Sequence, residues 1–250
     1  MRILVVNPNT STAMTATIAT AARAAASSGT EIVPFTAPYG VAGIDCTTES
    51  LISAVAVLDG VTRLVADGVP FDAVVLAGFG EHGREGLQEL LDVPVLDIAE
   101  VSAHAAMLLG RRFSVVTTLE RSVAAIEDRL LLAGLDAHCA SVLATGLTTS
   151  ELDADPRRAV AAVVERARRA VARDRAEVIC LGCGGLAGAA EAVSGEVGVP
   201  VVDGVGVGVR FAEALVGAGL RTSSVGSCAP PAVQPIAAWP LSAHLRDGVL

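Results

Sequence analysis

The chain has 250 residues, with 18 basic and 27 acidic side chains and a net charge of −9. Every basic residue is an arginine, which excludes a Schiff base, a pyridoxal phosphate linkage and the lysine of a phosphate-binding loop. The acidic balance also excludes the basic surface that nucleic acids and anionic membranes require, so we expect neither partner.

Short runs rich in Val and Ile alternate along the chain with longer Ala-rich stretches. The apolar runs predict strands at residues 2–6, 30–35, 73–77, 95–96, 114–117, 178–181 and 201–202. The stretches between them predict helices at residues 12–27, 51–67, 86–91, 101–109, 122–133, 156–175 and 208–216. Continuous apolar strands separated by helices are typical of parallel sheets covered on both faces. We therefore expect an α/β fold.

Three sequence patterns occur twice in the same order, each copy about 105–110 residues after the first. The paired segments are 2–7 and 112–117, 72–80 and 177–185, and 93–97 and 199–203. Such a repeat indicates two similar lobes with parallel sheets flanked by helices.

The repeat suggests where the lobes begin and end. We assign residues 1–98 to the first lobe and residues 99–207 to the second, and we expect residues 208–250 to pack back on the first. Ligands of open α/β sheets bind beyond the carboxyl ends of the strands. The active site is therefore expected in the cleft between the lobes.

The number of cysteines and the lengths of the apolar runs indicate the cellular compartment in which we expect the protein. The run at residues 3–6 is too short for a secretion signal, and no run approaches the roughly 20 apolar residues of a membrane span. Five cysteines in such a chain are typical of free thiols rather than of a disulfide framework. We expect a cytoplasmic protein.

Two predicted strand ends carry residues suited to binding and acid–base chemistry. Asn9 and Thr10 follow the first strand, where free amides at a helix start favour an anionic group. Cys183 follows a later strand and is flanked by Gly184 and Gly185. Exposed amides in that turn would lower the pKa of the thiol and could hold a developing oxyanion.

The equivalent strand end in the first lobe reads Gly78, Phe79, Gly80, Glu81 and His82. Its glycine-flanked histidine and glutamate are candidates for acid–base work on a substrate.

The spacing of Cys180 and Cys183 forms a C-x-x-C pair. No second pair or His cluster stands at zinc spacing, and Cys180 falls within a predicted strand, so we expect no metal site.

The opening RILVVNPNTS of residues 2–11 resembles that of the hydantoin and allantoin racemases, within the aspartate/glutamate/hydantoin racemase superfamily. The likeness continues through residues 79–80, 181–186 and 199–203 and covers nearly the whole chain. It implies a cofactor-independent enzyme that takes a proton from the carbon α to a carbonyl with one cysteine. A second cysteine, in the other lobe, returns a proton to the opposite face. The implied partner is a small substrate, a hydantoin, allantoin or amino-acid derivative, and the resemblance leaves room for a homo-oligomer.

This chain departs from the family pattern at one of the two thiols. The family's second cysteine corresponds to Cys183, but its first lies just before Phe-Gly, where this chain has Gly78. The usual Asp-Pro after Phe-Gly is replaced by Glu81 and His82. Racemisation by two groups needs an acid–base residue on each face of the carbon. His82, Glu81 and Cys46, which lies where relatives carry a substrate-facing segment, are the candidates.

Under the repeat, Thr117 and Thr118 correspond to Asn7 and Asn9. Their hydroxyls suit carboxylate or imide oxygens of a substrate, although threonines at strand ends also cap helices. We add both to the residues expected to bind substrate, with Gly78, Phe79 and Gly80.

Two other functions stay open at this point. Arylmalonate decarboxylase, in the same superfamily, resembles this chain in having Gly at the first position and one cysteine at the second. That resemblance implies a lyase in which Cys183 protonates an enediolate. The other alternative is a binding protein that keeps the cleft without the chemistry.

Overall fold

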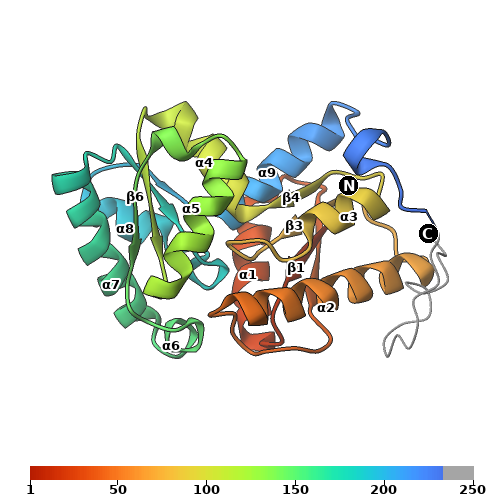
Figure 1. Cartoon of the computed structure of the whole chain (residues 1–250), viewed down its shortest axis with the longest axis horizontal. Coiled ribbons are helices and arrows are strands. Elements are labelled where there is room, and N and C mark those ends of the chain that lie inside the picture. The colour runs from red at the N-terminus through yellow and green to blue at the C-terminus, as the bar shows by residue number, and fades with distance from the viewer. Residues whose placement is uncertain (233–250) are drawn as a thin grey trace.

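Two four-stranded parallel sheets organise the computed structural model, which describes residues 1–232 (Figure 1). The first sheet has the order β2-β1-β3-β4 and the second the order β6-β5-β7-β8. The first-lobe strands are β1 (Arg2–Asn7), β2 (Glu31–Thr36), β3 (Ala73–Leu76) and β4 (Val95–Asp97). The second-lobe strands are β5 (Phe113–Thr117), β6 (Cys139–Ala144), β7 (Val178–Leu181) and β8 (Val201–Val202).

The helices lie on both faces of each sheet. They are α1 (Thr12–Ala25), α2 (Thr47–Ala66), α3 (Arg84–Leu90), α4 (Ile98–Leu109), α5 (Val123–Leu132), α6 (Thr149–Ala154), α7 (Pro156–Arg169), α8 (Ala190–Val197) and α9 (Gly204–Gly217). A short 3₁₀ helix, η4 (Gly184–Leu186), follows β7.

The register of the central strands confirms the internal repeat. Val6 of β1 lies opposite Leu76 of β3, and Val116 of β5 lies opposite Leu181 of β7. The two lobes therefore use equivalent residues at equivalent positions of their sheets. The same correspondence aligns Gly78, just after β3, with Cys183, just after β7.

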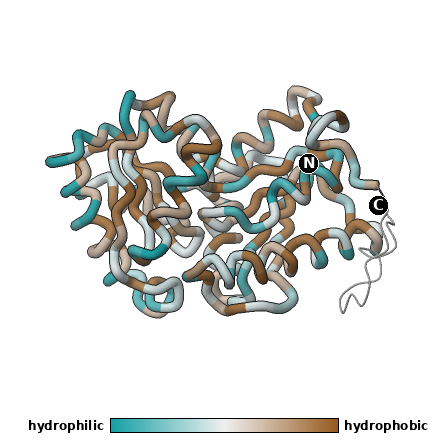
Figure 2. The backbone as a smooth tube through the Cα atoms, in the orientation of Figure 1, coloured by the Kyte–Doolittle hydropathy of each residue, from teal (hydrophilic) through white to brown (hydrophobic). Residues whose placement is uncertain are grey.

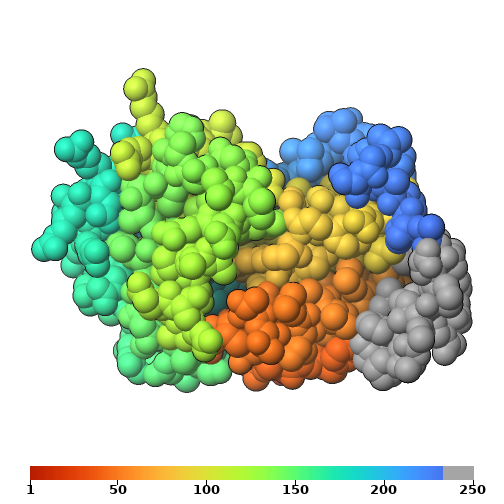
Figure 3. All heavy atoms as spheres, in the orientation of Figure 1, coloured from red at the N-terminus to blue at the C-terminus, as the bar shows by residue number. Residues whose placement is uncertain are grey.

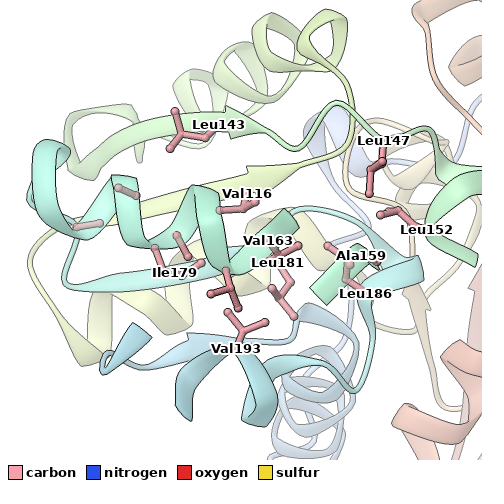
Figure 4. Close-up of a cluster of buried hydrophobic side chains, with 14 residues drawn as sticks. Val116, Leu143, Leu147, Leu152, Ala159, Val163, Ile179, Leu181, Leu186 and Val193 are labelled. Atoms are coloured by element: carbon pink, nitrogen blue, oxygen red, sulfur yellow. The ribbon is translucent and has the colours of Figure 1, made fainter. Parts of the chain in front are cut away.

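Apolar clusters fill the space between each sheet and its helices. In the first lobe one cluster lies under α1 and α9 and another under α2 and α3. In the second lobe one lies under α4 and α5, and the other, around Val163 and Ile179, under α7 and α8 (Figure 4). Hydrophobic segments accordingly run through the interior of both lobes (Figure 2). Burial on both faces is why the central strands are continuous apolar runs.

The chain crosses back to the first lobe through α9. Val205 and Val209 of this helix share a buried cluster with Ile3 and Ile18. In Figure 1 the blue helix α9 lies on the half of the molecule that holds β1 and β3. Residues 233–250, which belong to the C-terminal segment expected to pack on the first lobe, lie outside the described residues.

Four elements differ from the sequence-based expectation. The apolar pattern does not predict the edge strand β6 or the short helices α6 and α8. The helix predicted at residues 156–175 begins at Pro156, with Asp155 accepting from the Arg158 amide. Its regular part ends at Arg169 and continues as a π-helical turn over Ala170–Asp174. Within residues 1–232, no helix is both long and apolar enough to cross a membrane.

Candidate active site

Cys183 lies at the turn between β7 and η4, and its side chain packs partly against an apolar cluster of the second lobe. The Thr117 hydroxyl donates to the carbonyl of Gly182 at 3.1 Å, which fixes the end of β7 against β5. Directly after it, the Sγ atom of Cys183 accepts from the Gly185 amide at 3.4 Å. The thiol is therefore held by the backbone of its own turn.

The environment of Cys183 favours the protonated thiol. Burial raises its pKa to about 11, and the nearby carboxylate of Asp45 acts in the same direction. The amides of Gly185 and Leu186 lower the pKa, but their effect is smaller than that of burial. The sequence-based expectation that this turn would lower the pKa is wrong, because desolvation outweighs two amide contacts. At neutral pH Cys183 is a proton donor.

The backbones of the two lobes touch beside this cysteine. A Cβ atom on Gly184 would lie 2.1 Å from the carbonyl oxygen of Ala77, at the end of β3. Phe79, two residues further, packs against apolar clusters of both lobes. The loops after β3 and β7 therefore meet at the seam between the lobes, which is indented in the space-filling view (Figure 3).

His82 occupies the space beside Gly78, where the family's first thiol would stand. A Cβ atom on Gly78 would lie 2.2 Å from the His82 Cδ2 atom and 2.8 Å from its Nε2 atom. A Cβ on Gly80 would lie 3.3 Å from the same nitrogen. The two glycines thus make room for the imidazole, which is buried.

A hydrogen bond to Ser50 fixes the ring of His82. The Nδ1 atom lies 3.0 Å from the Ser50 hydroxyl, and that hydroxyl donates to the Glu81 carbonyl at 2.6 Å. Burial, with a smaller contribution from Arg129, lowers the pKa of His82 to about 4, although Asp97 and the Glu81 carbonyl act in the opposite direction. The imidazole is neutral at physiological pH.

The carboxylate of Glu81 belongs to a different group of side chains. It accepts from the Gly83 amide at 2.6 Å and lies 3.4 Å from Nη1 of Arg129. Partial burial and the neighbouring Glu85 raise its pKa to about 7. Its side chain is directed to an ion-pair cluster around Arg129, so the structure does not place it with His82 as a base.

Cys46 is the N-cap residue of α2, where its amide donates to the Glu49 carboxylate at 3.1 Å, and it lies next to a bridge between the lobes. The adjacent Asp45 accepts from the amide of Thr149 at 3.3 Å and from its hydroxyl at 2.9 Å. Since Thr149 begins α6, the loop before α2 contacts the second lobe. Asp45 also acts on Cys183, and no sequence pattern predicts either contact.

The residues after β1 mostly hold their own turn together. The Asn9 side-chain oxygen accepts from Asn7 Nδ2 at 2.8 Å and from the Ser11 amide at 2.9 Å. The amide of Thr10 donates to Val41. Ser11 caps α1 by accepting from the Met14 amide. Asn9 therefore has little hydrogen-bonding capacity left for a substrate.

Thr117 and Thr118 differ in availability. The hydroxyl proton of Thr117 is already donated to Gly182, so its main contact is structural, and substrate binding by this residue stays a prediction. Thr118 is buried, and its hydroxyl has no hydrogen-bond partner among residues 1–232. Of the two threonines, Thr118 is the one free to bind a ligand.

Another cavity of the described chain and its groups of acidic, His and Cys side chains do not suggest a second site. A cavity of about 510 Å³ lies between the end of α2, α3 and the segment after α9, with Phe71, Leu91 and Thr222 in its wall. None of the residues discussed above lines it. In the described part of the chain, no three His, Cys, Asp or Glu side chains gather in a way that could hold a metal ion.

A two-lobed α/β protein whose thiol-bearing and imidazole-bearing turns meet at the carboxyl ends of its sheets has the architecture of an enzyme for a small molecule. The family model described as Asp/Glu/Hydantoin racemase matches residues 3–212. The chain belongs to this family.

Individual relatives agree with the family assignment. The allantoin racemase from Pseudomonas fluorescens has a TM-score of 0.90 and 54% identity, covering 94% of this chain and 99% of that chain. The hydantoin racemase of Pseudomonas sp. strain NS671 is 38% identical over 225 residues, 90% of each chain. Unliganded arylmalonate decarboxylase, at 21% identity and a TM-score of 0.58, covers 86% of this chain and 91% of that chain. That last likeness is one of fold alone, so the lyase alternative fits less well than a racemase.

Proposed function

We propose that this chain is a cofactor-independent racemase that inverts the carbon α to a carbonyl in a cyclic ureide such as a hydantoin or allantoin. Cys183 acts as the acid–base residue on one face of that carbon. The substrate class follows the relatives, which are named hydantoin racemase and allantoin racemase.

One observation carries the proposal from the structure. The Cys183 thiol stands at the seam between the lobes, next to the contact of Gly184 with Ala77, with a pKa raised to about 11. A thiol kept protonated at the end of a buried strand is suited to delivering a proton to a carbanion.

The enolate formed when the proton leaves needs hydrogen-bond donors. We assign this role to the Thr118 hydroxyl and to the amides of Phe79 and Gly80. The same groups would orient the ring carbonyls of the bound ureide.

The test uses enantiopure allantoin and a panel of enantiopure 5-substituted hydantoins in deuterated water. Circular dichroism follows inversion and proton NMR follows replacement of the α-hydrogen by deuterium. The wild type should do both, and Cys183→Ala should lose inversion by about 10²-fold or more. The matched control is Cys139→Ala. Burial also raises the pKa of Cys139 to about 11, but this thiol lies on β6 and donates a hydrogen bond to the Ser141 carbonyl.

The other functions give different outcomes with the same protein. Release of CO₂ from a disubstituted malonate, without exchange of any hydantoin, would replace the racemase by a decarboxylase. A ligand-induced rise in Tm without exchange at any α-carbon would indicate a binding protein.

A further inference from the structure

We propose that His82 is the second catalytic residue, with its Nε2 atom serving the face of the carbon opposite Cys183 in place of the thiol missing at Gly78. This inference rests on the proposed function and specifies how the reaction proceeds in a chain with one cysteine at the site.

The first argument is the position of the ring. The repeat aligns Gly78 with Cys183, and the turns that carry them meet where Gly184 contacts Ala77, so we expect a thiol on Gly78 to face Cys183 across the seam. That space holds the His82 imidazole, because a Gly78 Cβ would lie 2.8 Å from Nε2 and 2.2 Å from Cδ2. The nitrogen thus stands about where the absent side chain would project its sulfur.

The second argument is the tautomer. The Ser50 hydroxyl has one proton, which it donates to the Glu81 carbonyl at 2.6 Å. Its oxygen must therefore accept from His82 Nδ1–H, 3.0 Å away. The other ring nitrogen, Nε2, then carries the lone pair. Within residues 1–232 no hydrogen-bond donor or acceptor meets Nε2, so this lone pair is available as a base.

The third argument is the protonation state of His82 and Cys183. Burial keeps His82 neutral and Cys183 protonated at physiological pH. A pair that inverts a carbon needs one base and one acid at the start of each turnover. His82 supplies the base and Cys183 supplies the acid.

The step balances without any further reactant. His82 Nε2 removes the α-proton, and the C–H electron pair becomes the enolate, whose charge lies on the carbonyl oxygen. The Sγ–H of Cys183 then delivers its proton to the opposite face, which leaves imidazolium and thiolate. A turnover of the opposite enantiomer runs the same transfers backwards and restores the neutral pair.

Single-face exchange distinguishes this arrangement from one in which His82 only fills space. Both enantiomers of the substrate turned over by the wild type are incubated with His82→Asn in deuterated water. Asparagine can still donate to Ser50 but has no basic nitrogen. We expect inversion to fall by about 10²-fold or more, while exchange of the α-hydrogen of one enantiomer, without inversion, should appear only as the pH rises towards the pKa of Cys183. Cys183→Ala should exchange the other enantiomer, and His138→Asn, an exposed histidine, should behave as the wild type.

Each outcome has a distinct meaning. If the wild type racemises and His82→Asn inverts both enantiomers within threefold of it, His82 is not catalytic and the proposed function stands. If the wild type exchanges no ureide, both proposals are overturned. Nitrogen NMR of wild-type protein labelled at histidine gives a measurement that needs no folded variant. At neutral pH we expect His82 to be neutral with its proton on Nδ1, and a proton on Nε2 would overturn the assignment.

Discussion

Gly184 of the second lobe touches the backbone of Ala77 in the first, at a separation that leaves 2.1 Å between the Ala77 oxygen and a hypothetical Gly184 Cβ. Only a residue without a side chain permits this approach. The contact holds the turn that carries Cys183 against the strand end that carries Gly78. The distance between Cys183 and the groups beside Gly78 therefore depends on this contact.

We predict that Gly184→Ala separates these two strand ends. Relieving the overlap should cost about 1–3 kcal/mol in the free energy of unfolding, measured by urea denaturation. A misplacement of about 1 Å at the reacting groups should lower the racemisation rate by about 10²-fold.

The matched control is Gly195→Ala in α8, where no atom lies within 4 Å of the position that a Cβ atom would take. Alanine in a helix interior should leave the rate unchanged and raise stability by up to about 1 kcal/mol. Equal rates and stabilities for the two alanine variants would contradict a tight contact at Gly184.

Gly78→Cys tests how the chain accommodates its missing thiol. The new Cβ would overlap His82 Cδ2 and lie 2.8 Å from Pro8 Cγ, so thiol and imidazole cannot both keep their places. We predict that Gly78→Cys alone racemises more slowly than the wild type, whereas Gly78→Cys/His82→Ala racemises at least about tenfold faster than His82→Ala. A double variant no faster than His82→Ala would mean that residue 78 does not face Cys183.

The sheets were predictable from the sequence because parallel strands buried on both faces must be continuous apolar runs. Strand β6 was not predicted because it is an edge strand. Its first residues, Cys139, Ala140 and Ser141, are only partly buried. Helices α6 and α8 span six and eight residues, too few for a clear helical period.

Within the site, Cys183 and His82 could be singled out because each stands in a glycine-rich turn after a buried strand. The residues that surround these two side chains could not be predicted from the sequence. Ser50 lies 32 residues before His82, in α2, and Arg129 comes from the other lobe. No local pattern reports such contacts, and the direction of the Cys183 pKa depends on burial that only the folded chain reveals.

The buried imidazole should make stability depend on pH. The pKa of His82 falls from 6.5 in the unfolded chain to about 4 in the fold. Between these values the unfolded chain binds more protons, so the free energy of unfolding decreases as the pH falls from about 6.5 towards 4. We predict a loss approaching about 3 kcal/mol, seen as the difference between wild type and His82→Asn in urea denaturation at several pH values. His138→Asn should track the wild type, and parallel curves for His82→Asn and wild type would show that His82 titrates normally.

An ion-pair cluster around Arg129 joins the lobes next to His82. Arg129 of α5 lies 2.5 Å from Glu85 and 2.7 Å from Asp97, a carboxylate with 1% exposure. Asp97 also caps α4 by accepting from Ala99 and Glu100. One guanidinium of the second lobe thus holds the end of β4 and the start of α3 in the first.

Arg129→Met should therefore weaken the fold and alter His82 together. Leaving the buried Asp97 without this partner should cost about 3 kcal/mol in the free energy of unfolding. Because Arg129 lowers the pKa of His82, its removal should also raise that pKa, shifting the acid limb of kcat/KM for racemisation to higher pH. Arg168→Met is the control, since its pair with Glu196 is exposed and should contribute less than about 1 kcal/mol without moving the pH profile. If the two methionine variants lose similar stability and keep the same acid limb, the Arg129 cluster neither joins the lobes nor acts on His82.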